Sequence, residues 1–396
     1  MYNRAIKRAA MSLLCFVAIL SCIFIGTASA APAKKKSSKS PVVIGYYPSW
    51  SAGQFTPSEI PFKRLTHVHF AFAIPQGPGS DEWKFESSDD SFKQLVTFAH
   101  AAGTKVLLSY GGWGGSQTFS GIVSSAARRT KFVKNALGFV KKFNLDGIDI
   151  DWEYPGSAGN TNDFNAAHDT DNFLLLLKQL RKALDARYKG SKRKEITAAT
   201  SMDPWSKNGT PLKDLRAFVP LLDRVGIMTY DVYGSWSSTT GPNSPLNTSP
   251  ENSLAITSAV KAWKRAGFPA KKIIVGVAFY GRGATASKAM SNSQYVPFNA
   301  GSSKEYTYKD LRSQGILATS TKAVAPWVRH FDKVSSTPWL YNKNTKAFIS
   351  YDDPVSLKLK GQFVKRNGYA GVMIWEVSQD TASSELLVAL RKGLRG

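Results

Sequence analysis

Cysteine is nearly absent from this chain of 396 residues. Its only two cysteines, Cys15 and Cys22, lie within the first 30 residues, a segment that its composition marks for removal. The remainder offers no disulfide, no thiolate metal site and no cysteine nucleophile. Without disulfides the fold depends on a large apolar core, and 43% hydrophobic residues with only 20% charged residues predict one.

The first 30 residues have the pattern of a secretory signal peptide. A basic start at residues 4–8 precedes an apolar run from Ala9 to about Ile25, and Ala28-Ser29-Ala30 supplies a small-x-small cleavage pattern. We predict cleavage after Ala30 and a secreted, extracellular protein, with cell-wall association left open. An uncleaved membrane anchor is the alternative, because the apolar run is long for a signal peptide.

Acidic residues are scarce relative to basic ones. The formal net charge is +24, and it becomes 49 − 28 = +21 without residues 1–30, which hold three basic residues and no acid. Residues 31–40 form a predicted basic tail that contains four lysines. Such a charge attracts nucleic acid or anionic cell-wall surfaces. The basic residues are spread along predicted helices without any nucleic-acid-binding signature, which favours a solvated surface and no nucleic-acid partner.

Histidine is scarce too. The chain has five, and they form no cluster of metal-ligand spacing, so we predict neither a metal nor another cofactor. His67 and His69 alternate along one apolar run and are interpreted as packing residues.

From Pro41 onwards, short apolar runs alternate with longer amphipathic ones. This alternation predicts an α/β protein whose residues 41–396 form a (β/α)8 TIM barrel. A doubly wound open sheet is the alternative, but no Gly-rich phosphate loop follows the first run. The predicted strands are Val42–Tyr47, His67–Ala73, Lys105–Tyr110, Gly147–Glu153, Ile196–Met202, Val225–Tyr230, Ile273–Phe279 and Ala370–Trp375. The predicted helices are Asp90–Ala102, Ser125–Phe143, Asp171–Tyr188, Asn252–Ala266 and Pro354–Arg366.

The connection between the seventh and eighth predicted strands is too long for one helix. Residues 283–350 are rich in Ser, Thr, Tyr and Lys and contain strand-like pieces at Tyr306–Tyr308, around Trp339 and at Ala347–Ser350. We predict a small α+β insertion here.

The segment DGIDIDWEYP, residues 146–155, holds most of the functional information. Asp149, Asp151 and Glu153 alternate with apolar residues, so in a strand the three carboxylates share one face. Grouping three buried carboxylates is costly through desolvation and mutual repulsion. The pattern therefore predicts a working site and not a charged edge strand.

Aromatic side chains stand near the carboxyl end of almost every predicted strand, where a barrel of this kind places its site. Sugar rings stack on aromatic faces, while acids and tyrosines bind their hydroxyl groups. The residues at these ends are Tyr46, Phe72, Ser109, Trp113, Tyr154, Met202, Met228, Tyr230, Asp231, Arg282 and Trp375. Together with the three acids they predict a carbohydrate-binding cleft.

These motifs resemble those of family 18 glycoside hydrolases, the chitinases. DGIDIDWEYP fits that family's DxxDxDxE signature, and Ser109-x-Gly111-Gly112 fits its marker on the third strand. Met228-x-Tyr230-Asp231, Tyr280-Gly-Arg282 and Trp375 follow in the family's order, and residues 283–350 resemble the insertion domain of one chitinase subgroup. The resemblance implies a monomeric enzyme that hydrolyses chitin and chitooligosaccharides at β-1,4 linkages with retention.

Cleavage of a glycosidic bond needs a proton on the leaving oxygen, and only a carboxyl group of raised pKa delivers one at neutral pH. Glu153 is the outermost of the three acids, and we expect nearby ionised carboxylates to raise its pKa. Asp149 and Asp151 are expected to form a coupled pair that shares a proton.

The resemblance also implies roles for individual residues. Glu153 is the acid and then the base, and Asp151 binds the acetamido nitrogen of the sugar, whose own oxygen attacks the reacting carbon. Tyr230 and Asp231 hold the acetamido group, and Trp375 lies beneath the sugar. Tyr46, Ser109, Gly111, Gly112 and Asp146 support the site, and Phe72, Trp113, Tyr154, Met202, Met228 and Arg282 line it. Non-proline cis peptides are expected near Phe72, Tyr154 and Glu376.

Two other functions are compatible with the same family. A chitin-binding lectin on this fold would lack the terminal acid, which is present here as Glu153. An endo-β-N-acetylglucosaminidase acting on N-glycans would usually lack the α+β insertion. A polybasic wall-adhesion protein would leave the carboxylates unexplained.

Overall fold

The computed structural model describes residues 40–396 except 78–79, 81, 86 and 162. The predicted signal peptide, residues 1–30, and the predicted basic tail as far as residue 39 lie outside the described residues. The description that follows concerns the unit formed by Pro41–Gly396.

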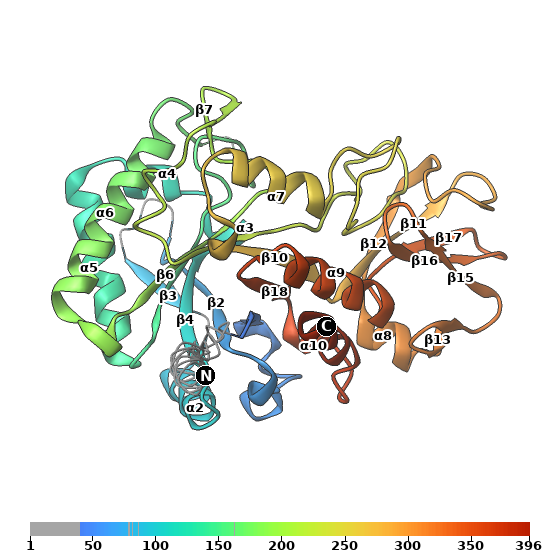
Figure 1. The fold of residues 1–396 in the computed structure, drawn as a ribbon, viewed down its shortest axis with the longest axis horizontal. Coiled ribbons are helices and arrows are strands. Elements are labelled where there is room, and N and C mark those ends of the chain that lie inside the picture. Colours follow the sequence, from blue (N-terminus) through green and yellow to red (C-terminus); the bar gives the residue numbers. More distant parts are fainter. Residues whose placement is uncertain (1–39, 78–79, 81, 86, 162) are drawn as a thin grey trace, which may run out of the picture. The chain divides into compact units, whose positions relative to one another are not determined.

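Eight parallel strands close into a barrel, which confirms the predicted (β/α)8 fold (Figure 1). Their order around the ring follows the chain, and the last strand pairs with the first through Val42↔Gly371 to Gly45↔Ile374. The barrel strands are β1 Val42–Pro48, β2 His67–Pro75, β4 Lys105–Gly111, β5 Gly147–Asp151, β6 Glu195–Thr200, β9 Arg224–Ile227, β10 Ile273–Ala278 and β18 Gly371–Trp375. A short strand, β3 Trp83–Phe85, adds to β2 in antiparallel fashion.

Several strands are shorter at the carboxyl end than predicted. The fourth barrel strand, β5, was expected to reach Glu153 but ends at Asp151, because its neighbour β4 ends at Gly111, the partner of Asp151, and turns into α3 Gly112–Gly115. The fifth and sixth barrel strands, β6 and β9, were expected to reach Met202 and Tyr230 but end at Thr200 and Ile227. Residues predicted as strand ends, Glu153 among them, therefore lie in the loops above the barrel.

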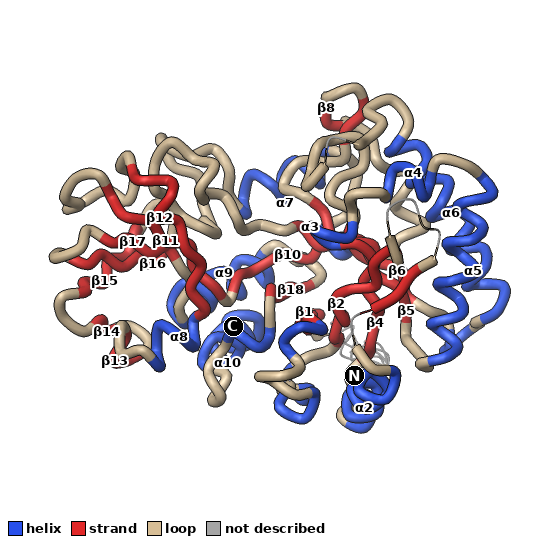
Figure 2. Tube along the Cα trace, turned by 180° about the vertical axis from the view of Figure 1, so that it is seen from behind, coloured by secondary structure: helices blue, strands red, loops and turns tan. Residues whose placement is uncertain are grey.

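Helices pack around the outside of the barrel, as Figure 2 shows in blue. They are α2 Asp89–Ala101, α4 Phe119–Val123, α5 Ala126–Lys142, α6 Asp169–Arg187, α7 Ile256–Arg265, α9 Pro354–Arg366 and α10 Glu385–Arg395. Ser88 and Ser125 cap the first turns of α2 and α5, and Asp353 caps α9 just before Pro354, a residue suited to a first turn. Each long helix buries one apolar stripe against the strands.

A second sheet of five strands follows β10, at the side of the barrel in Figures 1 and 2. Its strands are β11 Tyr280–Ala286, β12 Phe298–Thr307, β15 Trp327–Asp332, β16 Thr337–Asn342 and β17 Ala347–Ser350, with α8 Tyr308–Ser313 and the hairpin of β13 Leu317–Thr319 and β14 Lys322–Ala323 between them. It is antiparallel, begins at residue 280 where 283 was expected, and has a small core of its own around Trp339 and Phe348. Another hairpin, β7 Ser206–Lys207 and β8 Thr210–Pro211, rises from the loop after β6.

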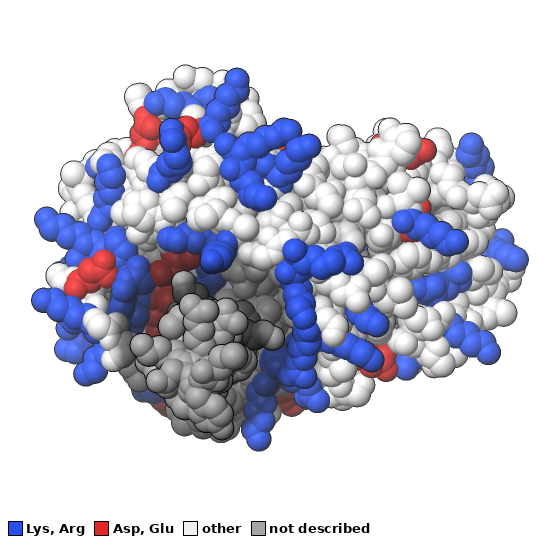
Figure 3. Space-filling view, viewed as in Figure 1, with Lys and Arg blue, Asp and Glu red and all other residues white. Residues whose placement is uncertain are grey.

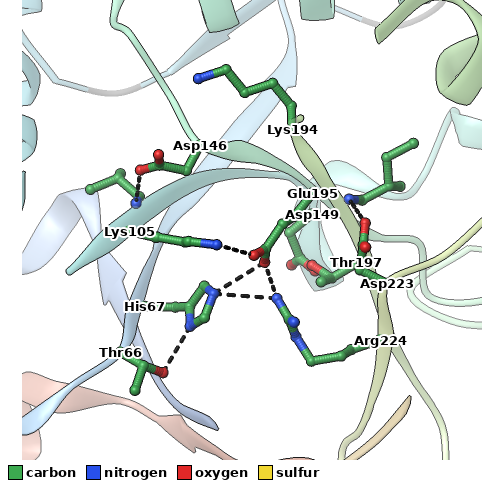
Figure 4. A network of polar contacts seen from close by, with 12 residues as sticks. Thr66, His67, Lys105, Asp146, Asp149, Lys194, Glu195, Thr197, Asp223 and Arg224 are labelled. Atoms are coloured by element: carbon green, nitrogen blue, oxygen red, sulfur yellow. Dashed lines mark hydrogen bonds and ion pairs between the residues drawn. The ribbon is translucent and has the colours of Figure 1, made fainter. Parts of the chain in front are cut away.

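The interior of the barrel is divided into an apolar side and a charged side. Ile44, Ile274 and Met373 pack together in one cluster. At the amino end of the strands, Glu195 of β6 lies among His67 of β2, Lys105 and Arg224, as Figure 4 shows. These ion pairs tie four strands together at the end of the barrel opposite the predicted site.

Lys and Arg side chains lie in several separate groups over the face seen in Figure 3, where few acids are visible. Among the helices within residues 40–396 that the structure describes, none is long and apolar enough to span a membrane.

Candidate active site

Asp149 lies on β5 and is buried, and three hydroxyl groups from other strands donate to its carboxylate. Its Oδ2 accepts hydrogen bonds from the Tyr46 hydroxyl and from Ser109 Oγ, both at 2.7 Å, and its Oδ1 accepts one from Thr197 Oγ1 at 2.5 Å. These donors come from β1, β4 and β6, so three strands that are not adjacent in the barrel fix one carboxylate. His69 Nδ1 lies 3.4 Å from Oδ2.

Asp151 and Glu153 lie above Asp149, and Ser116 holds the backbone that joins them. Ser116 Oγ donates to the carbonyl of Asp151 at 3.0 Å and accepts from the amide of Glu153 at 3.0 Å. Asp151 is 3% exposed, and its Oδ1 has no hydrogen-bond partner within the described residues. An acceptor of this kind is free to bind an N–H group of a ligand.

The three acids differ in their affinity for protons. Burial raises the pKa of Glu153 to about 7, with the Tyr154 hydrogen bond opposing and the charge of Asp231 adding to the rise. Burial, followed by the charges of Glu153 and Asp149, raises the pKa of Asp151 well above its ordinary value. Burial opposes ionisation of Asp149 too, but the charge of His69 and the hydroxyl donors outweigh it and lower the pKa.

These pKa shifts bear on two expectations about the protons of the site. The expected cause of the raised pKa of Glu153, ionised carboxylates nearby, is secondary to burial. Of the Asp149–Asp151 pair that was expected to share a proton, Asp151 has the raised pKa and Asp149 the lowered one, because Asp149 is surrounded by donors and Asp151 is not.

On the other side of the acids, Asp231 is held by β11. Tyr280 Oη and Arg282 Nε each donate to Asp231 Oδ1 at 2.6 Å. Asn243 Oδ1 accepts from the Asp231 amide at 3.1 Å, and this loop residue is itself buried. Tyr230 is 9% exposed, and burial raises its pKa, with the charges of Asp151, Asp231 and Glu153 adding to the rise.

Trp375 of β18 joins the aromatic side chains into one wall. Its ring stacks on Phe72 at 5.8 Å between centroids and an interplanar angle of 18°, and lies 5.6 Å from the ring of Tyr46. Trp50 continues this wall at 6.2 Å from Phe72 and is 61% exposed. Trp113, after β4, is 52% exposed. Exposed fractions as large as those of Trp50 and Trp113 are unusual for a tryptophan.

Two glycines let backbone segments approach the acids closely. Gly111 has φ of +108°, and a Cβ there would lie 2.2 Å from the Asp151 carbonyl oxygen. A Cβ at Gly159, in the loop after the acid motif, would lie 1.9 Å from the Glu153 carbonyl oxygen. A Cβ at Gly112 would lie 2.5 Å from the Phe72 ring. No side chain fits at these places without a backbone shift.

The remaining predicted residues lie at different distances from the acids. Asp146 is at the opposite end of β5, where its Oδ2 accepts from the amide of Val106 at 2.8 Å and pairs with His100 at 2.9 Å. Met228 packs against Tyr230, whereas Met202 packs against the core between barrel and helices. Tyr154 is half-buried beside Glu153.

Sequence reasoning missed Ser116, Thr197 and Asn243 as site residues. Each is a single polar residue outside the motifs, and only its hydrogen bond to one of the acidic residues reveals it. Thr197 had one available signal, since it is two residues from Glu195 on a strand whose inward face is polar. The expected cis peptides are present at Ala71–Phe72, Glu153–Tyr154 and Trp375–Glu376.

No group of three or more His, Cys, Asp or Glu side chains in the described part of the chain is arranged to hold a metal ion. A cavity of about 160 Å³ lies next to Arg282, between residues 233–241 and the five-stranded sheet. The site thus combines a carboxyl group that is protonated near neutral pH, an unpaired acceptor and an aromatic wall.

Comparison with known proteins gives a consistent result. The family described as "Glycosyl hydrolases family 18" matches residues 42–380. A "chitinase-like effector" of Moniliophthora perniciosa is 34% identical over 89% of this chain and 86% of its own length. "Chitinase A1" of Niallia circulans is 30% identical over 96% of this chain and 62% of its own length. The crystal structure of a chitinase from Rhizomucor miehei superposes with a TM-score of 0.80 at 31% identity, over 89% of this chain and 100% of that one.

Proposed function

Since the chain belongs to family 18 of the glycosyl hydrolases and is a glycoside hydrolase of the chitinase type, we propose that it hydrolyses β-1,4-linked N-acetylglucosamine with Glu153 as general acid and base. The observation that carries this proposal is the pKa of the half-buried Glu153, which is raised to about 7. A carboxyl group of this kind holds its proton at the pH where an ordinary glutamate has lost it.

In the first step Glu153 gives its proton to the glycosidic oxygen, while the acetamido oxygen of the same sugar attacks the anomeric carbon. The carbon–oxygen bond to the leaving sugar breaks, and a cyclic oxazolinium ion forms. In the second step Glu153, now ionised, takes a proton from water. The water attacks the anomeric carbon from the face that the leaving sugar vacated, and the bond from that carbon to the acetamido oxygen breaks, which opens the oxazolinium ring. Two displacements at one carbon give retention of configuration.

Asp151 orients the acetamido group in this proposal. Its unpaired Oδ1 accepts the acetamido N–H, which supports the positive charge that develops as the ring closes. Asp149 remains ionised beneath it, because three hydroxyl groups donate to it. Tyr230 and Asp231 hold the acetamido group from the other side, and Arg282 and Tyr280 fix the Asp231 carboxylate.

The aromatic wall binds the sugar rings. Trp375 with Phe72 forms the floor beneath the reacting sugar, and the exposed rings of Trp50 and Trp113 are positioned to stack on sugars further along a chain. Met228 and Tyr154 border the reacting sugar. No charge on the polymer is needed for such binding, which suits neutral chitin and chitooligosaccharides.

We also propose that the protein is secreted as a monomer. Support comes from the signal-peptide pattern of residues 1–30, which lie outside the described residues. The barrel of residues 41–396, with the insertion that begins at residue 280 in the structure, is then the secreted catalytic unit.

Replacing Glu153 with Gln tests the assignment. The amide has nearly the same shape but cannot deliver a proton, so we expect hydrolysis of chitin oligomers to fall about 10³-fold or more while oligomer affinity changes little. Glu385→Gln is the matched control, because Glu385 pairs with Arg312 away from the acids. Turnover by Glu153→Gln at the wild-type rate would refute the role of Glu153.

A product profile on labelled chitohexaose, with detection of the anomer formed, tests the reaction itself. We expect β-anomers first, and no cleavage of fully deacetylated chitosan, since that polymer lacks the attacking acetamido oxygen. Cleavage of deacetylated chitosan would refute substrate assistance.

A chitin-binding protein without hydrolytic activity is the second candidate, because one relative bears the name "chitinase-like effector". It predicts binding of chitohexaose with no product, at every pH. Release of the chitobiose core from N-glycans, with chitohexaose left intact, would instead identify an endo-β-N-acetylglucosaminidase.

A further inference from the structure

His69 lies inside the barrel directly beside Asp149, a position that the proposed reaction does not explain. It is 1% exposed, and its Nδ1 is 3.4 Å from Asp149 Oδ2. The ring meets Tyr46 edge to face at 5.0 Å between centroids. Neither ring nitrogen has a hydrogen-bond partner among the described residues. A buried imidazole with no bonded partner is costly unless its charge or its N–H is used.

Asp149 needs a neighbouring positive charge. The carboxylate is 1% exposed, and the groups that bond to it, Tyr46, Ser109 and Thr197, are neutral hydroxyls. Burial also raises the pKa of Tyr46, so its hydroxyl keeps its proton. Of the ion pairs in the described part of the chain, the one that includes Asp149 is the pair with His69.

The other charged groups facing this part of the barrel are already paired. His67, two residues before His69 and one layer lower, bonds through Nε2 to Glu195 at 3.1 Å and through Nδ1 to Thr66 at 2.8 Å (Figure 4). Burial lowers the pKa of His67 despite that contact. Arg224 and Lys105 both bond to Glu195, so the positive charges at this end serve Glu195 and not Asp149. Above Asp149, burial and the charges of Glu153 and Asp149 raise the pKa of Asp151.

We propose that His69 is a positioning residue of the hydrolytic reaction: it keeps a proton on Nδ1 facing Asp149, which holds Asp149 ionised and leaves the next proton on Asp151. This inference rests on the proposed roles of the acids. An ionised Asp149 accepts from three hydroxyl groups at once, whereas a protonated one would have to lose or reverse one of those bonds. With Asp149 ionised, its charge also helps to keep the proton on Asp151.

Removing the imidazole should therefore change the pH dependence of the reaction more than its maximum. Without a counter-charge Asp149 takes up a proton at higher pH, and the acids then carry one proton too many. The acid limb of the kcat profile is set by this protonation. We expect the limb to move upward and activity to recover at higher pH.

The test compares His69→Leu, which removes charge and donor, with His69→Asn, which keeps a neutral donor. Kinetics on a chitin oligomer are measured between about pH 4 and 9. For His69→Leu we expect the acid limb of kcat to move up by about one pH unit, which is a tenfold loss of kcat below the limb, with KM changed less than about twofold. His69→Asn should shift the limb less, and His168→Asn, at an exposed histidine just before the first residue of α6, should not shift it.

An equal loss of kcat at every pH, or an unmoved acid limb in His69→Leu, would overturn the proposal and leave His69 a packing residue. The ring is also observed directly in the full-length wild-type protein, by nitrogen NMR of its histidines assigned with His69→Asn. We expect a proton on Nδ1 of His69, and a neutral ring with its proton on Nε2 alone would overturn the proposal. This spectrum does not depend on activity, so it separates failure of the His69 proposal from failure of the Glu153 assignment.

Discussion

The raised pKa of Glu153 predicts where activity is lost on the alkaline side. The general acid must be protonated in the free enzyme, so kcat/KM should decline as pH rises through the pKa of Glu153, about 7. At pH 6 a carboxyl group with this pKa is about 90% protonated, whereas one with an ordinary pKa of 4.5 is about 3% protonated. Burial of Glu153 thus supplies a roughly thirtyfold larger population of the active form at pH 6.

Two substitutions should move this limb in opposite directions. The Tyr154 hydrogen bond lowers the pKa of Glu153, so Tyr154→Phe should move the alkaline limb to higher pH by roughly half a unit. The charge of Asp231 raises the pKa of Glu153, so Asp231→Asn should move the limb to lower pH. Asp231 also contacts the substrate in our proposal, so its variant should lose part of its maximal kcat/KM as well.

The assay is kcat/KM on a fluorogenic chitin oligomer across the pH range, with each profile scaled to its own maximum. Tyr369→Phe, at the end of α9 and packed against Phe363, is the matched control and should leave the limb in place. An alkaline limb near pH 4.5 in the wild type would refute the role of burial. A downward shift in Tyr154→Phe would refute the assignment of the limb to Glu153.

Three further predictions concern packing, stability and substrate binding. Gly159→Ala should lower kcat at least about tenfold, because its Cβ would lie 1.9 Å from the carbonyl oxygen of Glu153, the proposed general acid. Gly138→Ala, where the space is open, is the control and should leave kcat unchanged. Kinetics at fixed pH test both variants. Glu195→Gln should cost about 3–5 kcal/mol of unfolding free energy in denaturant titrations, because it removes the carboxylate that pairs with the largely buried Arg224 guanidinium. Glu385→Gln, at a more exposed ion pair, should cost less than about 1 kcal/mol. The pKa of Glu195 is lowered in the fold, so its contribution to the unfolding free energy is present above an unfolded pKa near 4.5 and is lost as pH falls below that value. Equal stability of the two variants at pH 7 would contradict this account. Trp113→Ala should raise KM for chitohexaose several-fold with little change for chitobiose-length substrates, and an unchanged KM for the longer oligomer would exclude stacking there.

The alternation of apolar runs and amphipathic segments was sufficient to predict the barrel, because each strand of a parallel barrel is buried on both faces and each helix on one. The spacing of Asp149, Asp151 and Glu153 was sufficient to predict an acid site, because alternate residues of a strand share a face whatever surrounds them. The predicted strand ends were less accurate. Glu153 was assigned to the strand, but β5 ends where the pairing of β4 ends, which local sequence does not encode.

The distribution of protons among the three acids was decided by the tertiary structure. Sequence spacing places Asp149 and Asp151 on an equal footing, whereas in the fold Asp149 receives hydroxyl groups from β1, β4 and β6 and faces His69, and Asp151 receives none of these. His69 itself read as a packing residue, because a histidine in an apolar run reveals no partner. A pKa depends on burial and on groups within a few ångströms, and those groups come from segments far apart in the chain. The sequence alone therefore determined that the three acids meet at one end of a barrel, while only the closed barrel decided which carboxyl group has a lowered pKa and which a raised one.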